Sequence, residues 1–122
     1  AAWAGGWAAA SVVNEVLYRL LQDDMVIRQF AAGLTAGAVG GAATCYLLRH
    51  SGASLSPTSA RVGSAAWALA FGVESVFSVF YSARVNPFIG PEFIVVRGAL
   101  LGLAWASGAY ALLAMEAKAR RQ

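Results

Sequence analysis

Glu74 is the residue whose type and position most clearly suggest chemistry. It lies among apolar and small residues near the middle of the segment 57–83, which is long enough to cross a membrane as a helix. A carboxylate at that depth costs about 2.5–3.5 kcal/mol to insert, so such residues pair with a base, face the interior of a helix bundle, or belong to a proton or ion path. Glu74 is therefore expected to have a partner.

Arg97 is the partner that we expect for Glu74. In an antiparallel hairpin of the segments 57–83 and 91–116, Glu74 lies about ten residues before the end of the first segment and Arg97 about six after the start of the second. At 1.5 Å per residue their depths differ by roughly 5 Å, which two long side chains can bridge. We predict an ion pair that fixes the register of the hairpin. A contact from Glu74 to a neighbouring subunit and a proton relay are the alternatives.

Small residues recur at helical spacing in all three apolar segments of the chain. They are Gly33, Gly37 and Gly41 in the first segment, Ser64, Ser75, Ser78 and Ser82 in the second, and Gly98 and Gly102 in the third. Small residues let helices approach closely within a membrane, so these positions are predicted to be packing surfaces. The other faces of the middle segment are expected to contact lipid or a partner protein through the aromatic residues Trp67, Phe71, Phe77, Phe80 and Tyr81.

No arrangement of residues in the sequence predicts catalysis or a bound metal. With one histidine, His50, and one cysteine, Cys45, the chain offers neither a catalytic triad nor a Cys/His metal site. His50 is expected to be a solvated residue at a membrane boundary, and Cys45 a small core residue. The sequence predicts no catalytic, cofactor-binding or metal-binding residue and leaves room for a structural lipid.

The composition indicates which kind of element must position these residues. Hydrophobic residues make up 59% of the 122 residues and charged residues 12%, with a mean hydropathy of +0.61. A water-soluble domain of this size needs far more charge to cover its surface. The basic residues, Arg28 among them, are spread singly near the expected helix ends, which argues against a nucleic-acid partner. The composition therefore predicts a membrane protein.

Charge-free intervals divide the chain into helices. We expect an all-α membrane protein with three transmembrane helices at about 25–48, 57–83 and 91–116. Asp23 and Asp24 are expected to cap the first of them, and Ser56 with Pro57 to begin the second. Segments rich in Gly, Pro, Ser and Asn separate the three helices. The whole chain, 1–122, is expected to form one membrane-embedded helical domain.

The N-terminal segment has a different pattern from the three apolar segments. Over residues 8–22, polar side chains gather on one side of a helix and valines and leucines on the other. We predict an amphipathic helix at about 8–22, in an interfacial arm over 1–24, that lies at the membrane surface or against a partner protein. Trp3 and Trp7, near the edge of the polar stripe, agree with a position at the interface. A fourth span over residues 3–21 is the alternative.

By elimination, these features favour a supporting role. We expect a non-catalytic accessory subunit of an energy-transducing complex such as the respiratory chain, with other membrane subunits and the lipid bilayer as partners. The mitochondrial inner membrane is preferred, and the thylakoid and the bacterial inner membrane are the alternatives. A small transporter or channel component with Glu74 in an ion or proton path is the second reading, and a peripheral photosystem subunit is the third.

Overall fold

Four helices account for nearly all of the chain that the structure describes. The computed structural model describes the backbone of residues 2–21, 24–84 and 91–121, and the side chains of 3–21, 24–78 and 95–121. The helices are α1 (Ala2–Leu20), α2 (Met25–His50), α3 (Pro57–Arg84) and α4 (Pro91–Arg121). The prediction of an all-helical chain is confirmed, and the three longer helices begin where the sequence places them and end one to five residues later.

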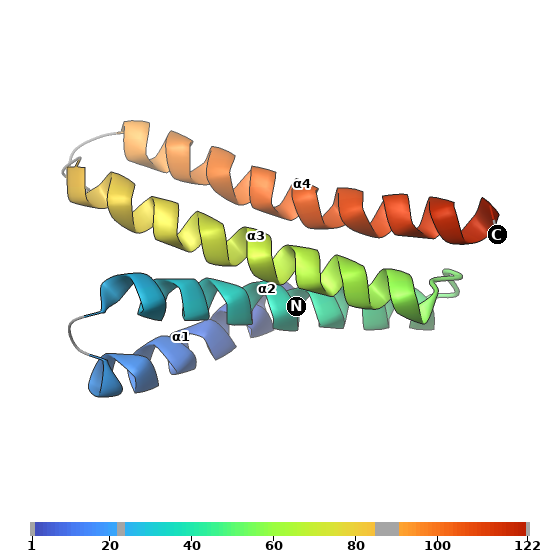
Figure 1. Cartoon of the computed structure of the whole chain (residues 1–122), viewed down its shortest axis with the longest axis horizontal. Coiled ribbons are helices and arrows are strands. Elements are labelled where there is room, and N and C mark those ends of the chain that lie inside the picture. The colour runs from blue at the N-terminus through green and yellow to red at the C-terminus, as the bar shows by residue number, and fades with distance from the viewer. Residues whose placement is uncertain (1, 22–23, 85–90, 122) are drawn as a thin grey trace.

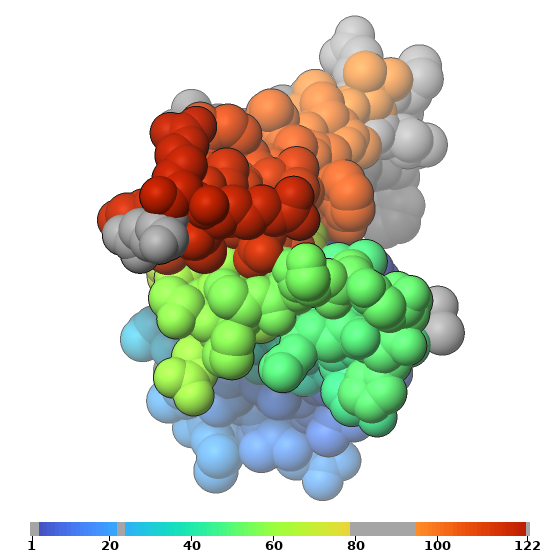
Figure 2. All heavy atoms as spheres, turned by 90° about the vertical axis from the view of Figure 1, so that its right-hand side faces the viewer, coloured from blue at the N-terminus to red at the C-terminus, as the bar shows by residue number. Residues whose placement is uncertain are grey.

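The helices pack in the order in which they follow one another along the chain. Figure 1 shows α3 between α2 and α4, with α1 against α2 on the far side. Seen from the end in Figure 2, α4 forms one side of the molecule and α1 the opposite side. Short connections join these neighbours, so successive helices run in opposite directions. This arrangement makes α3 the central helix of the molecule.

Local signals explain where α2 and α3 begin. The Asp24 carboxylate accepts a hydrogen bond from the backbone N–H of Ile27 at 3.1 Å, which confirms the predicted cap, whereas Asp23 lies outside the described residues. The Ser56 hydroxyl accepts the N–H of Ser59 at 3.1 Å, and Pro57 occupies the first helical position. Both predicted helix starts therefore rest on side-chain caps.

The N-terminal helix is longer than expected and packs on α2. It starts at Ala2 instead of residue 8, and small residues let it come close to its neighbour. A Cβ atom added to Gly6 would lie 2.6 Å from the carbonyl oxygen of Ala36, and Gly40 is covered by the Trp3 ring. Trp3 and Trp7 therefore point into the bundle, against α2 and α3.

Within the described residues, fewer helices pass as membrane spans than the sequence predicts. In the described residues, α2 and the part of α4 from Val95 to Arg121 are long and apolar enough, whereas α3 and α1 are not. Two of the three expected spans are thus supported, whereas the described part of α3 is not apolar enough, and its side chains from residue 79 onward lie outside the described residues. Arg61, Glu74 and several serines lower the hydropathy of α3, and its position between α2 and α4 covers Ser59, Ser75 and Ser78 with protein.

The aromatic residues of α3 correct a second expectation. Trp67 is 1% exposed and touches all three other helices, whereas Phe77 is 60% exposed. Phe71 is buried against Trp3 and Trp7. The predicted lipid or partner contact is therefore wrong for both residues, because glycines on α2 and α4 leave room for the Trp67 ring and the α1 tryptophans cover the Phe71 ring. The side chains of Phe80 and Tyr81 lie outside the described residues.

Candidate functional site

The Glu74 carboxylate lies between α3 and α4, where Arg97 approaches it. Arg97 Nε is 3.8 Å from Glu74 Oε1, and the Ser78 hydroxyl donates a hydrogen bond to the same oxygen. The Glu74 side chain is 1% exposed and that of Arg97 is 38% exposed. The antiparallel arrangement of the two helices thus brings together the two residues that the sequence pairs, one buried and one partly in contact with the surroundings.

The second oxygen of Glu74 has a different environment. Oε2 is buried and has no hydrogen-bond donor among the described residues. Glu74 also lines an open groove of about 400 Å³ between α3 and α4, with exposed apolar walls that include Val73, Phe77 and Leu103. A buried carboxylate oxygen without a donor loses hydration that nothing replaces. The Glu74 carboxylate is therefore only partly satisfied by the described chain, with Oε1 bonded and Oε2 without a donor.

The glycine ridge of α2 meets α3 at close range. A Cβ atom added to Gly33 would overlap the backbone carbonyl of Phe71, and one added to Gly37 would overlap the backbone of Trp67. One added to Gly41 would lie 2.9 Å from the Trp67 ring and 3.2 Å from Ser64 Cα. These three positions therefore work as a flat surface on which α3 rests.

The serines of α3 divide between two roles. Ser64 and Ser75 lie against the α2 glycines, so they help the backbones to approach. Ser78 is bonded to Glu74 within its own helix. Ser82 belongs to α3, but its side chain lies outside the described residues. The described serines of α3 thus have two functions: they allow close packing against α2, and one of them donates a hydrogen bond to the Glu74 carboxylate.

The glycine ridge of α4, Gly98 and Gly102, meets no neighbour among the described residues. Nothing lies within 4 Å of a Cβ atom added to Gly98 or to Gly102, whereas the α4 glycine that does touch α3 is Gly108, which lies beneath the Trp67 ring. Trp67 Nε1 also donates a hydrogen bond of 2.8 Å to the carbonyl oxygen of Trp105. Sequence spacing selected Gly98 and Gly102 over Gly108, because it cannot show which face of α4 meets α3.

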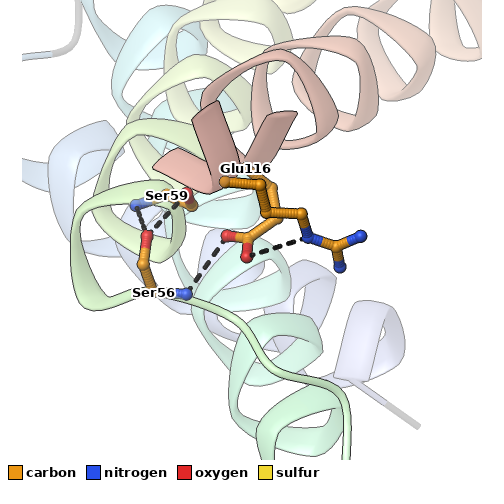
Figure 3. A network of polar contacts seen from close by, with 4 residues as sticks. Ser56, Ser59 and Glu116 are labelled. Carbon is orange, nitrogen blue, oxygen red and sulfur yellow. Dashed lines mark hydrogen bonds and ion pairs between the residues drawn. The ribbon is translucent and has the colours of Figure 1, made fainter. Parts of the chain in front are cut away.

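A polar tie at the opposite end of the α3–α4 pair was missed by sequence reasoning. The backbone N–H of Ser56, at the start of α3, donates to Glu116 Oε2 at 3.2 Å, and Ser56 and Ser59 share a hydrogen bond of 2.7 Å (Figure 3). Arg120 Nε lies 3.8 Å from Glu116 Oε1. The sequence did contain a signal for this contact. In an antiparallel α3–α4 pair, the cap residue Ser56 at the start of α3 lies beside the last turns of α4, which carry the charged residues Glu116 and Arg120.

A buried arginine near the closed end of the α1–α2 hairpin was also missed. Arg28 is 7% exposed, although the sequence counts it among the basic residues near helix ends. Its guanidinium lies 4.7 Å from the centroid of the Tyr18 ring. Nε and Nη1 of Arg28 and Oδ1 of Asn14 are buried without hydrogen-bond partners in the described chain. The sequence does not indicate that Arg28 is buried, because it is one of several single basic residues near the expected helix ends.

Two single residues lie where the sequence predicts. Cys45 is buried beneath α3, with Sγ 3.8 Å from the carbonyl oxygen of Ala60, as expected of a core residue. His50 is exposed, and its ring lies on Tyr46, with Nδ1 3.0 Å from the Tyr46 carbonyl oxygen. These contacts describe a structural cysteine and a surface histidine.

Comparisons with known proteins place this chain in no described group. No protein-family model matches the sequence, and neither the curated proteins nor the solved structures contain a match.

Proposed function

We propose that the chain is a non-catalytic accessory subunit of an energy-transducing membrane complex, which it supports through helix packing. The observation that carries the proposal is the ridge of α4, where none of the described residues approaches Gly98 or Gly102. Two helices with the length and composition of membrane spans, α2 and α4, support the membrane location.

The α2 ridge indicates what such a surface is suited for. Gly33 and Gly37 let the α3 backbone come so close that any larger side chain would collide with it. The same four-residue spacing on α4, at Gly98 and Gly102, is free of contacts from the described chain. Small residues give little benefit to a helix that touches only lipid, because lipid chains adapt to any surface. A helix from another subunit is therefore the occupant that we infer.

The apolar surface beside this ridge points in the same direction. Leu103, Trp105, Tyr110 and Leu113 on α4 are largely exposed, and they form an extended apolar surface on one helix. Such a surface favours either lipid or a second protein, and the adjoining glycines favour the protein. The finer assignment, to the respiratory chain of the mitochondrial inner membrane, rests on the absence of any recognised pigment ligand other than His50. An absorption spectrum without chlorophyll bands would agree with it and count against a photosystem subunit.

The proposal is tested by blocking the ridge. We expect Gly102→Leu to leave the chain folded, because nothing lies within 4 Å of the new Cβ, and to abolish its co-purification with other subunits in mild detergent. Gly5→Leu is the matched control, since Gly5 also lies in a helix with open space around it. Sizing of the tagged protein gives the readout. A monodisperse small homo-oligomer free of other subunits would refute the proposal.

A second candidate function is supported by the environment of Glu74. Its Oε2, which has no donor among the described residues, and the groove that Glu74 lines are features that a transporter or channel component would need at an ion or proton path. Glu74→Gln separates the two functions. If the variant assembles normally but changes the ion flux into reconstituted vesicles, transport is supported. If the wild type shows no ion flux and the variant fails to assemble, the structural role is supported.

A further inference from the structure

Five of the nine basic residues gather at one end of the bundle. This end holds the last turns of α2 and α4 and the first turns of α3, which lie together in Figure 1 and face the viewer in Figure 2. The backbone N–H of Ser56 donates to the Glu116 carboxylate, so the start of α3 and the end of α4 form one surface. All five basic residues are exposed, and together we call them the basic end: Arg49, Arg61, Lys118, Arg120 and Arg121.

The basic end carries little negative charge of its own. Glu116 is the one acid in the sequence of the turns that form it. Glu116 Oε2 accepts the N–H of Ser56 at 3.2 Å, and Oε1 lies 3.8 Å from Arg120 Nε. The Glu116 side chain is 14% exposed, whereas that of Arg120 is 71% exposed. The basic end therefore presents mainly positive charge to its surroundings.

The other half of the bundle has a different balance of charge. By position in the sequence, it holds the remaining four basic residues together with five of the six acids. Arg19 and Arg97 each lie beside a glutamate, at 3.2 and 3.8 Å. Arg28 is buried, and the side chain of Arg84 lies outside the described residues. Basic residues that are spread singly along the sequence are thus brought together by the fold at one end.

The helix dipole accounts for only part of the basic end. Basic residues in the last turns of α2 and α4 stabilise those helices, because a helix carries partial negative charge at its C-terminal end. Arg61 lies near the start of α3, where the dipole of its own helix is positive and gives no such benefit. A negative partner outside the chain accounts for Arg61 and for the other four residues alike.

The basic end lies at the depth of lipid headgroups. The 26 residues of α2 are about 39 Å long at 1.5 Å per residue, so centring them on about 30 Å of hydrocarbon leaves roughly one turn outside at each end. Arg49 belongs to the last turn of α2. Exposed apolar side chains lie nearer the middle of the same three helices: Tyr46, Leu47, Val62 and Leu113. An apolar band followed by long basic side chains is typical of a membrane–water boundary.

We propose that the basic end binds the anionic phospholipid headgroups of one leaflet. Phosphate oxygens accept hydrogen bonds from Arg and Lys side chains, and each basic residue near an anionic membrane surface strengthens the attraction about fivefold. The exposed apolar side chains beside the basic end favour lipid over an acidic protein, because acyl chains cover them while the headgroups meet the charges. The inference rests on the membrane location in the proposed function, but it requires no other subunit.

The test compares the lipids next to the two ends of the purified chain in vesicles. A fluorophore is attached to Ser54→Cys, in the α2–α3 connection, or to Leu21→Cys, just after α1, while the native Cys45 is buried. Quenching by spin-labelled phosphatidylglycerol and phosphatidylcholine gives the ratio of their binding constants near each fluorophore. We expect a ratio of about five at residue 54 and about one at residue 21. Salt at about 0.5 M should reduce the ratio at residue 54, because it screens exposed charges.

Removing the charges tests the residues themselves. The combined substitutions Arg49→Gln, Arg61→Gln, Lys118→Gln and Arg121→Gln should bring the ratio at residue 54 to about one, since they leave only Arg120, which lies beside Glu116. Lys118→Gln with Arg121→Gln changes only the last turn of α4 and should lower the ratio partway, which keeps the test decisive if the fourfold variant does not fold. Arg19→Gln, an exposed residue of the other half, is the matched control and should leave the ratio unchanged.

Equal binding of the two lipids near residue 54 of the wild type would overturn the assignment and leave an acidic protein as the partner to seek. A ratio that is as high at residue 21, or that neither salt nor the substitutions reduce, would also overturn it. A preference for phosphatidylglycerol in a chain that purifies without other subunits would reject the proposed function alone. No preference in a chain that co-purifies with other subunits would reject this inference alone.

Discussion

At the scale of single residues, burial decides what each charge contributes. Glu15 and Arg19 form an exposed ion pair on α1, and such pairs contribute about 0.3–0.5 kcal/mol. Glu74 is buried, so its contact with Arg97 offsets a desolvation cost that the exposed pair does not have. Losing one partner should therefore have a much larger effect at Glu74 than at Glu15.

A double-mutant cycle on Glu74 and Arg97 tests this difference. We expect Arg97→Leu alone to lower the free energy of unfolding by about 1–3 kcal/mol, because it leaves a buried carboxylate with Ser78 as its remaining partner. The double variant Glu74→Leu with Arg97→Leu should recover part of this loss. Denaturant unfolding in detergent gives the values, and the Glu15 and Arg19 cycle is the control. Strictly additive effects at Glu74 and Arg97 would show that the two residues do not interact.

At the scale of the elements, backbone proximity holds α3 on α2. The glycines of α2 bring the two backbones together, and a backbone cannot move aside as a flexible side chain can. Glycine is otherwise a poor choice inside a helix, since it costs about 0.8–1.0 kcal/mol relative to alanine. The sign of a glycine substitution should therefore depend on what lies opposite.

Gly37→Ala and Gly5→Ala are expected to act in opposite directions. The added methyl at Gly37 overlaps the Trp67 backbone, so α3 must shift and the thermal midpoint should fall by several degrees. At Gly5 the space is open, so the better helix propensity of alanine should raise the midpoint slightly. Thermal unfolding followed by circular dichroism measures both. A stabilising Gly37→Ala would mean that α2 and α3 are farther apart than described.

At the scale of the whole molecule, one side chain joins all four helices. Trp67 touches Trp3 of α1, Gly41 of α2, and Gly108 and Trp105 of α4. The central position of α3 makes this possible, because α3 lies between α2 and α4 (Figure 1). Because Trp67 contacts every other helix, the four helices should unfold together, and loss of its ring should destabilise all of them.

Trp67→Ala is expected to destabilise the fold by about 3–5 kcal/mol, the usual cost of removing a large buried aromatic ring. Trp105→Ala, whose ring is about half exposed, should cost clearly less. The measurement is the denaturant midpoint of each variant in the same detergent. Similar losses for the two variants would indicate that Trp67 is not the centre of the core.

Local chemistry in the sequence determined much of this fold. Asp24, Ser56 and Pro57 cap or begin helices through contacts within a few residues, so the starts of α2 and α3 could be predicted. The pairing of Glu74 with Arg97 follows from two helix lengths and a short connection, which fix relative depth without any knowledge of the core. These inferences needed only the distance along the chain.

Only the tertiary structure decided which faces are covered. Lipid and protein interiors are similarly apolar, so the composition of a helix face does not show which of them it meets. The sequence therefore could not show that Trp67 and Phe71 lie in the core, or that Gly108 packs on α3 whereas Gly98 and Gly102 have no neighbour among the described residues. Arg28 is buried because α1 crosses it, and the contact depends on a register that no local pattern encodes. Shape complementarity between the packed faces of successive helices therefore determined the site, whereas local charge and capping determined the elements.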